Sequence, residues 1–382
     1  MSHPVSHPLR GRCVIAGIGA TAFGKLPGRS TVSLNVEACR AALADAGIAK
    51  DVVDAVLVKT PTSAREILYG QKLAEALGLQ PRLNHALDQG GAANITLISQ
   101  AVMAIEAGQC EVALVCYADN PRSGSRAVYA RPRGEDAVLG WFSTAAGYAM
   151  IQRRFMLEHG VPEETFGQVA ITCRAHGAAN PRAQLRKPLT LEDYLAGPLM
   201  IEPMRRDDAC LVSDGGAAVV VMSARRAKEL GVPAPVPILG FGQGHTAWEV
   251  AQRADLTTTE AAKAAAAAFA MAGLGPRDIQ VAQLYDCFTV TPLMTLADYG
   301  FCKPAQLAGF VGEGRIGLGG DLPINTAGGL LSETGMPGLQ LVHEAVRQLR
   351  GTATLQVPAP RNALVSNQGG TMHTHATLIL GH

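Results

Sequence analysis

The sequence places a phenol, a carboxylate and a thiol next to one another in the segment Tyr285-Asp286-Cys287-Phe288-Thr289. The apolar run 280–285 that leads into it predicts a buried strand, and strand ends are where α/β proteins build ligand sites. A buried polar group needs a hydrogen-bond partner, so we interpret Tyr285 and Asp286 as candidate catalytic residues. For Cys287 and Phe288 we favour packing in the core.

Two turns combine asparagine with paired glycines, and both could bind an oxyanion. Backbone N–H groups and an amide side chain are the parts of an oxyanion hole. The alternative is that both are simply tight turns, in which these residue types are common. The candidate substrate-binding residues of the two turns are Asn325, Gly328, Gly329, Asn367, Gly369 and Gly370.

Two histidines follow the second turn, at positions 373 and 375. This spacing places both side chains on one face of a strand. We interpret His373 as a third candidate catalytic residue, because an imidazole can assist a neighbouring acid or base. A zinc site would need a further ligand near this pair, and none is evident in the sequence, so we expect no metal. The eight cysteines are scattered without a Cys-x-x-Cys pair.

The segment Asp88-Gln89-Gly90-Gly91 stands directly before an apolar-periodic stretch, 92–107, that predicts a helix. Free N–H groups and the positive end of the dipole favour a nucleophile or an oxyanion at a helix N-terminus. We therefore expect Asp88 and Gly91 to face the substrate, with a plain N-cap aspartate as the alternative.

Several arginines crowd one loop and a later segment. Such a cluster suits an anionic ligand such as a phosphate, although a solvated loop has the same pattern. The arginines are Arg122, Arg126, Arg131, Arg133, Arg205 and Arg206.

The elements that must position these residues alternate between strand and helix. Each of two stretches runs through strand, helix and buried strand to closing strands, so we predict two similar α/β halves, 1–230 and 235–382, that share one core. Residues 119–210 interrupt the first half, and we interpret them as an insertion above the core, with helices near 141–159 and 163–178. The expected strands are 13–17, 52–59, 111–117, 215–222, 236–241, 280–285, 363–367 and 377–380, and the expected core helices include 30–46, 92–107 and 336–349.

The composition excludes several classes of protein. The 382 residues are 48% hydrophobic and 17% charged, which suffices for a large buried core. With 33 Lys and Arg against 32 Asp and Glu, the net charge is +1, so no basic field attracts nucleic acid. The sequence contains no stretch of about 18 uncharged apolar residues, which is the length that a membrane-spanning helix needs. The first twelve residues lack the apolar core of a secretory signal, so we expect a cytoplasmic protein.

The chain resembles the thiolase superfamily over nearly its whole length. The resemblance rests on the segments AGIGATAFGKLPGRS, SDGGAAVVVMSARRAKEL, YDCFT, and NTAGGLLSETG through HEAVRQLRG. It is most similar to the sterol-carrier-protein-x branch, also called lipid-transfer proteins. This resemblance implies a five-layered α-β-α-β-α core, a coenzyme A thioester as substrate, no tightly bound cofactor, and a homodimer formed through the sheet of the first half.

The same resemblance shows three departures. Thiolases place a nucleophilic cysteine at the N-terminus of the helix that begins here near Ala92, and we align Asp88 with that cysteine. The thiolase motif Gly-His-Pro corresponds to Gly335-Met336-Pro337, so Met336 takes the place of the histidine beside the substrate. The second thiolase cysteine would fall in the segment Ser366-Asn367-Gln368. Ordinary thiolysis needs an acyl-thioester on cysteine, which a carboxylate cannot form.

One branch of the superfamily also lacks the nucleophilic cysteine. These are the aldolases that shorten steroid side chains by cleaving a β-hydroxyacyl-CoA, and their Tyr-Asp-x-Phe-Thr motif is matched by residues 285–289. A second tyrosine of these relatives lies in a Ser-Glu-Gly-Tyr stretch, which corresponds to 332–335, where Gly335 replaces it. The resemblance also implies a small zinc-ribbon/OB-fold companion protein.

Three functions remain open from the sequence. The first is retro-aldol cleavage of a β-hydroxyacyl-CoA, with Tyr285 as base, His373 as its neighbour, and the glycine turns holding the thioester oxygen. The second is an acyltransferase of the acetyl-CoA acetyltransferase type, with Cys287 as nucleophile. The third is an acyl-CoA- or lipid-binding subunit without chemistry.

Overall fold

Two strand–helix series meet where β1 (Cys13–Ala20) pairs with β8 (Val236–His245). The computed structural model describes residues 7–127, 135–141, 143–248, 250–336 and 338–382. Within these residues nine strands join in the order β3-β2-β4-β7-β1-β8-β11-β10-β9. Only Val14 and Ile15 of β1 pair with β8, so the two halves of the sheet are joined at one short seam.

The first half contains five of these strands. Parallel β2 (Ala55–Lys59), β3 (Leu83–Leu87) and β4 (Val112–Asp119) continue into antiparallel β7 (Gly215–Ser223) and β1. Helix α1 (Thr31–Ala46) begins where the Ser30 hydroxyl accepts from Ser33 N–H and ends at left-handed Gly47. The remaining helices of this half are α2 (Tyr69–Leu77), α3 (Ala93–Glu106) and α7 (Ala224–Glu229).

The second half repeats the plan with β8, β9 (Val281–Gln283), β10 (Asn362–Gly369) and β11 (Thr374–Gly381). Strand β10 pairs with β9 in parallel and with β11 in antiparallel register. The accompanying helices are α8 (Ala261–Ala272), α9 (Val290–Asp298), α10 (Leu307–Gly312), α11 (Gly329–Ser332) and α12 (Leu339–Arg350). The second series thus begins like the first, with a strand, a helix and a strand.

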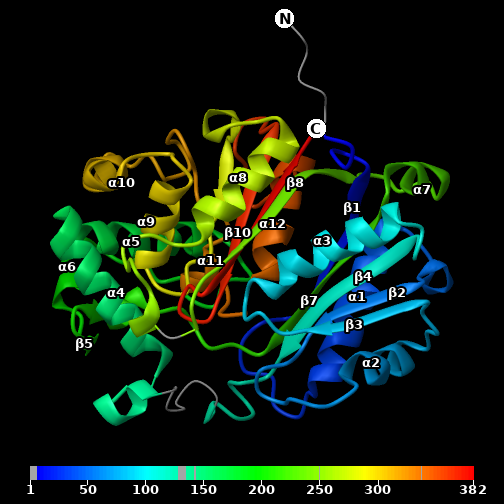
Figure 1. The fold of residues 1–382 in the computed structure, drawn as a ribbon, viewed down its shortest axis with the longest axis horizontal. Coiled ribbons are helices and arrows are strands. Elements are labelled where there is room, and N and C mark those ends of the chain that lie inside the picture. The colour runs from blue at the N-terminus through cyan, green and yellow to red at the C-terminus, as the bar shows by residue number, and fades with distance from the viewer. Residues whose placement is uncertain (1–6, 128–134, 142, 249, 337) are drawn as a thin grey trace, which may run out of the picture.

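Three apolar clusters show how the layers stack. One cluster packs α1 and α2 on the outer face of the first half-sheet, through residues such as Leu43, Leu73 and Val56. A second places α3 and α12 between the inner faces of both half-sheets. A third covers the outer face of the second half-sheet with α8 and α9. The layers therefore run α-β-α-β-α, as expected, with α3 and α12 in the middle layer (Figure 1).

The insertion packs on the second half although the chain enters it from the first. It contains α4 (Thr144–His159), α5 (Glu163–Ala179), α6 (Leu191–Ala196) and a hairpin of β5 (Leu199–Ile201) and β6 (Met204–Arg205). Phe166, Val169 and Cys173 of α5 join the apolar cluster that contains α9 and α10. Figure 1 shows these helices beside α9 and α10, away from α1 and α2. No helix among the described residues is long and apolar enough to cross a membrane.

Candidate active site

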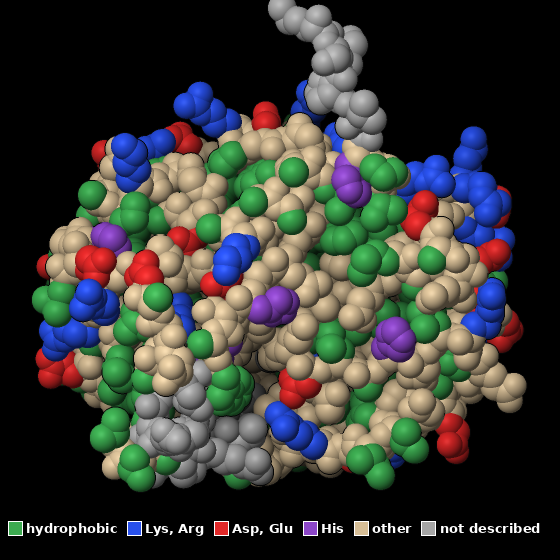
Figure 2. Space-filling view, viewed as in Figure 1, with side chains coloured by type: hydrophobic (Ala, Val, Ile, Leu, Met, Phe, Trp, Pro, Cys, Tyr) green, Lys and Arg blue, Asp and Glu red, His purple; other side chains and the backbone are tan. Residues whose placement is uncertain are grey.

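A cavity of about 720 Å³ opens between the two halves and under the insertion. The face drawn in Figure 2 is hollowed near its centre, where the halves meet. Pockets of this size hold drug-sized ligands. The candidate site residues on its wall are Asp88, Gly91, Tyr285, Gly369, Gly370 and His373.

Tyr285 lies just beyond the end of β9, as its motif predicts, and is 8% exposed. The Thr291 hydroxyl donates to its carbonyl oxygen at 2.6 Å, which fixes the backbone at the start of α9. Its ring lies against Gly91, where an added Cβ would come within 2.5 Å of Tyr285 Cε2 and still closer to the phenol oxygen. Gly91 directly precedes Ala92, the N-cap residue of α3. The phenol thus occupies the space beside the N-terminus of α3, where the helix dipole stabilises negative charge.

Asp88 does not stand at the helix N-terminus, because the N-cap residue of α3 is Ala92 and the helix begins at Ala93. Asp88 Oδ1 accepts from Gly90 N–H at 3.1 Å, and Oδ2 pairs with Arg65 at 3.0 Å. The aspartate therefore closes a short turn rather than capping α3. Gly91, not Asp88, stands next to the N-terminus of α3. Asp88 nevertheless lines the cavity, as expected.

The second glycine turn packs against the backbone of the first half. A Cβ on Gly369 would clash with the Gln89 carbonyl, and one on Gly90 would lie 2.6 Å from Gly369 Cα. Gly90 and Gly370 also have φ of +57° and +66°, which favours glycine. Close approach of the halves thus requires these glycines, and the segments 88–91 and 368–370 both line the cavity.

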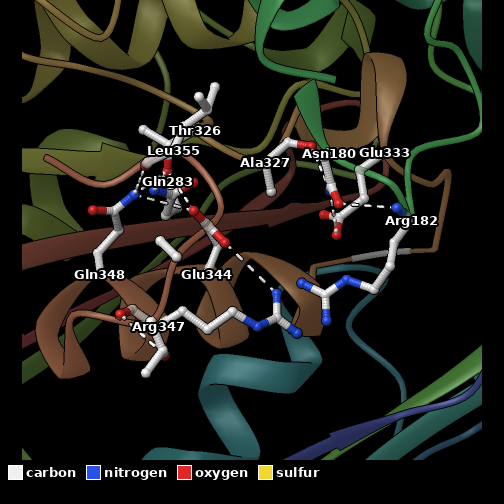
Figure 3. A network of polar contacts seen from close by, with 12 residues as sticks. Asn180, Arg182, Gln283, Thr326, Ala327, Glu333, Glu344, Arg347, Gln348 and Leu355 are labelled. Atoms are coloured by element: carbon white, nitrogen blue, oxygen red, sulfur yellow. Dashed lines mark hydrogen bonds and ion pairs between the residues drawn. The ribbon is translucent and has the colours of Figure 1, made fainter. Parts of the chain in front are cut away.

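The first Asn-Gly-Gly turn does not line the cavity, contrary to expectation. The Asn325 amide, fully buried, accepts from Leu284 N–H at 2.7 Å and donates to Leu284 O at 2.9 Å. The two hydrogen bonds of the Asn325 amide therefore fix the backbone that follows β9. Next to it, Thr326 donates to Glu344 at 2.7 Å and accepts from Gln348 and Gln283, in the buried network of Figure 3.

Asp286 also points away from the cavity, which argues against a catalytic role. Its carboxylate accepts from the N–H groups of Leu330 at 2.7 Å and Leu331 at 3.2 Å, at the start of α11. Gly329 makes room for the Asp286 carboxylate, since a Cβ at residue 329 would lie 2.7 Å from Asp286 Cγ. Gly328, which precedes Gly329, has a left-handed backbone conformation. Burial raises the pKa of Asp286 to about 6, although these N–H bonds lower it. Tyr285 therefore lines the cavity, whereas its neighbour Asp286 does not.

Two further candidates lie outside the cavity wall. Met336 is 2% exposed, and its N–H donates to the Thr334 hydroxyl at 3.3 Å. Asn367 is fully buried in β10, where its amide lies against Gly338 at the start of α12. Gly335, where the resemblance predicts that a tyrosine has been lost, does line the cavity, but a Cβ there would clash with the Leu211 carbonyl. No side chain fits at position 335 in this backbone.

The two histidines do not share one face. His373 lies in the turn before β11, lines the cavity, and donates from Nδ1 to Ala247 O at 2.9 Å. With Nδ1 protonated, neutral imidazole carries its lone pair on Nε2. His375 lies within β11, 3.0 Å from the Tyr299 hydroxyl, and burial lowers its pKa to about 3. Among the described residues, no three His, Cys, Asp or Glu side chains could hold a metal ion.

Tyr148 and Gln368 belong to the cavity but were missed from the sequence. Tyr148, from α4, donates to Gly370 O at 3.0 Å, and Gln368 Nε2 lies 3.5 Å from both the Tyr148 hydroxyl and Cys287 Sγ. The Tyr148 ring stacks on Phe288 with centroids 4.4 Å apart. Burial raises the pKa of Cys287 to about 12, so this thiol stays protonated. A single tyrosine within a helix gives no signal in the sequence.

The arginine cluster does not gather at the cavity. Arg131 and Arg133 lie outside the described residues. Arg122 donates to Gln184 at 2.9 Å, and Arg205 pairs with Glu163. None of the described arginines of this group lines the cavity.

Comparison with known proteins places the chain in a family. Residues 242–382 match the family model described as thiolase C-terminal domain-like. The chain is 38% identical to a steroid side-chain-cleaving aldolase of Thermomonospora curvata, over 98% of each chain. It is 36% identical to the 17-hydroxy-3-oxo-4-pregnene-20-carboxyl-CoA lyase of Mycobacterium tuberculosis, over 98% of this chain and 100% of the relative.

Solved structures agree with the sequence relatives. An Ltp2-ChsH2(DUF35) aldolase matches 98% of both chains at 36% identity, with a TM-score of 0.89. Human mitochondrial 3-ketoacyl-CoA thiolase, at 16% identity and a TM-score of 0.75, shares the fold. The resemblance inferred from the motifs is thereby confirmed. The chain belongs to the thiolase superfamily, in the lipid-transfer-protein branch that includes the steroid side-chain-cleaving aldolases.

Proposed function

We propose that the protein cleaves a β-hydroxyacyl-CoA thioester by a retro-aldol step. The observation that carries this proposal is the phenol of Tyr285 at the N-terminus of α3, in the space beside Gly91. In thiolases this helix terminus serves a cysteine nucleophile. Here a potential base stands where a nucleophile would, so the arrangement favours proton transfer over acyl transfer.

The step is balanced within the substrate. Tyr285, as phenolate, accepts the proton of the β-hydroxyl group, and the β-carbon becomes a carbonyl. The Cα–Cβ bond breaks, and its electron pair passes into the thioester as an enolate. Protonation of the enolate carbon then gives a shortened acyl-CoA. The positive end of α3 stabilises the phenolate before the step, and turn N–H groups beside it can hold the enolate oxygen.

His373 fits a supporting role in this proton transfer. It lines the same cavity, and its Nδ1–H bond to Ala247 O fixes the tautomer with the lone pair on Nε2. An imidazole in this state can receive a proton from a phenol, directly or through water, and later return it.

The acyltransferase alternative depends on Cys287, the cavity thiol of the motif. Nucleophilic cysteines react as thiolates, and burial opposes ionisation of Cys287. Its described side-chain contacts, the Gln368 amide and the Tyr148 hydroxyl, are not groups that take up a thiol proton as a base would. These observations favour the lyase.

The finer assignments follow the relatives. We propose a 3-oxo steroid with a 17-hydroxyl and a CoA-activated side chain as substrate, as the Mycobacterium tuberculosis relative's name states for that enzyme. We also propose a DUF35-type companion, as named for the structural relative. We further propose a homodimer that forms through β3. Strand β3 lies at the edge of the sheet, and its residues His85 and Ala86 are exposed, which supports pairing with a second copy.

The test is product analysis by mass spectrometry with a panel of β-hydroxyacyl-CoA and β-ketoacyl-CoA esters, with and without a companion protein. We expect a ketone or aldehyde and a shortened acyl-CoA from the β-hydroxy esters. Thiolytic products from β-ketoacyl-CoA and free CoA would contradict the lyase. Light scattering at micromolar concentration tests the dimer, which a stable monomer would contradict.

A further inference from the structure

Two thiols, Cys210 and Cys287, line the cavity from different segments of the chain, and the proposed reaction uses neither of them. Cys210 ends the insertion, whereas Cys287 follows Tyr285 in the motif. Both are free and half-buried, so each keeps part of its surface open. Two accessible thiols in one cavity are a candidate site for a thiophilic ligand.

The backbone places these two cysteines opposite each other. Ala209 and Phe288 form an antiparallel bridge, and Cys210 N–H donates to Cys287 O at 2.9 Å. Cys210 and Cys287 are therefore the next pair along this bridge. Directly opposed side chains in antiparallel pairing lie on the same face, which agrees with the presence of both thiols in the cavity wall. A ligand in the cavity can thus reach both sulfur atoms at once.

The spacing of such a pair favours a bridge through one atom over a direct disulfide. Opposed Cβ atoms in antiparallel pairs lie about 4.5–5.5 Å apart. A disulfide brings its two Cβ atoms to about 3.5–4.5 Å. One atom that is bonded to both sulfurs spans the larger separation without a shift of either backbone segment.

The surroundings of the pair favour a neutral ligand over a metal cation. A zinc site takes at least three protein ligands, and in the described part of the chain no three His, Cys, Asp or Glu side chains could share an ion. Burial raises the pKa of both thiols, so two thiolates on one cation would be costly. A trivalent arsenical meets both conditions, because it is a soft centre that bonds two thiol sulfurs and stays neutral.

We propose that Cys210 and Cys287 form a dithiol site for a trivalent arsenical, which bridges the two sulfurs and closes the cavity to acyl-CoA. With phenylarsonous acid, two As–OH bonds break and two As–S bonds form. Each thiol proton leaves with a hydroxyl group as water, and arsenic stays trivalent, so the step needs no oxidant. The closing of the cavity rests on the proposed function, because it takes acyl-CoA as the ligand of this cavity.

A second pair of neighbouring thiols provides an internal comparison. Cys116 and Cys39 are joined by a side-chain hydrogen bond, but neither has any exposed surface. They belong to the apolar cluster on the outer face of the first half-sheet, away from the cavity. The arsenical is therefore expected to react with Cys210 and Cys287 and to leave Cys39 and Cys116 free.

The first experiment locates the arsenical and measures its affinity, with phenylarsonous acid as the probe. We expect intact-mass spectra of the natural protein to show one arsenical per chain. Peptide mapping without reduction is expected to recover the peptides of Cys210 and Cys287 joined through arsenic. Because this mapping uses the natural protein, it does not depend on the folding of a variant.

Cysteine variants measure the contribution of the second thiol. In calorimetric titrations, Cys210→Ser and Cys287→Ser are each expected to bind the arsenical at least about a hundredfold more weakly than the natural protein. The reason is that the second As–S bond forms within one molecule, at a high effective concentration. Cys302→Ser is the matched control, because it removes a half-buried thiol that does not line the cavity, and it should bind as tightly as the natural protein.

A competition experiment measures acyl-CoA binding without turnover. The probe is 3-oxo-4-pregnene-20-carboxyl-CoA, which has no 17-hydroxyl to deprotonate. We expect the bound arsenical to prevent binding of this probe, and we expect removal of arsenic with dimercaptopropanol to restore it.

The outcomes separate the site from the proposed reaction. Unchanged affinity for the arsenical in either serine variant, or arsenic mapped to Cys39 and Cys116, would overturn the site. Unchanged binding of the acyl-CoA probe to the bridged protein would overturn the closing of the cavity. Competition in a protein that cleaves no β-hydroxyacyl-CoA would refute the lyase while supporting the dithiol site.

Discussion

The ring of Tyr285 occupies the space that a side chain on Gly91 would need. A Cβ at residue 91 would lie 2.5 Å from both Tyr285 Cε2 and the Gln368 carbonyl oxygen. The two residues are far apart in sequence and belong to different halves, so their contact exists only when α3 and β9 come together. The absence of a side chain at 91 is therefore what admits the phenol to the terminus of α3.

Gly91→Ala is expected to displace the Tyr285 phenol and to lower kcat by at least about a hundredfold, the scale of a misplaced acid–base group. Overpacking also costs about 1–3 kcal/mol of stability. Gly312→Ala is the matched control, because nothing lies within 4 Å of its Cβ. Steady-state kinetics and thermal unfolding on both variants test this. Full turnover in Gly91→Ala would show that the contact has no part in the reaction.

Tyr285→Phe removes the phenol oxygen and keeps the volume of the ring. We expect turnover to fall by about a hundredfold or more, with little change in thermal midpoint. If the Tyr285 hydroxyl only forms a structural hydrogen bond, the variant instead loses about 1 kcal/mol of stability and keeps its turnover. Asp286→Asn is the comparison. It disturbs the N–H bonds at the start of α11, so it should lower stability more than Tyr285→Phe and turnover less.

Incubation with acyl-CoA is expected to give no covalent acyl-enzyme in intact-mass spectra. The reason is that desolvation raises the pKa of the half-buried Cys287 thiol to about 12, so it supplies almost no thiolate near neutral pH. Cys287→Ala should correspondingly retain turnover within a few-fold. An adduct mapped to Cys287 by peptide analysis would establish the acyltransferase mechanism in place of the lyase.

Glu333 should make stability depend on pH in a definite direction. Its side chain is 1% exposed, and burial raises its pKa from 4.5 to about 7, against the lowering effect of Arg347 and Arg182. Since the folded protein binds this proton more tightly than the unfolded chain, the contribution is fully present below pH 4.5. It is lost as pH rises through 7. The shift corresponds to roughly 3 kcal/mol.

The glutamine variant isolates this effect. The free energy of unfolding of Glu333→Gln, relative to the natural protein, is expected to rise by up to about 3 kcal/mol between pH 4.5 and pH 8. Asp286 and Asp298 titrate in an overlapping range but are present in both proteins, so they cancel in the difference. Denaturant unfolding across this range measures it, with exposed Glu75→Gln as control. Parallel curves for Glu333→Gln and the natural protein would contradict the assignment.

The sequence by itself indicated the superfamily and most of the alternating strands and helices, although not α2 (Tyr69–Leu77) or β3 (Leu83–Leu87). These depend on local features: apolar periodicity, glycine at helix ends, and motifs that remain contiguous, such as residues 285–289. It also placed Tyr285 and the 369–370 turn at the site, because strand ends and glycine turns mark such positions in the chain.

Only the tertiary structure decided which residues face the cavity. Tyr285 lines the cavity, whereas the carboxylate of its neighbour Asp286 accepts from Leu330 N–H at the start of α11. Gly91, three residues after Asp88, is the residue that stands at the terminus of α3. Of two similar turns, one packs against Gln89 of the other half and lines the cavity, while the other holds Leu284. Tyr148 lines the cavity because α4 of the insertion folds over it. Such placements depend on contacts between distant segments, which no local pattern encodes.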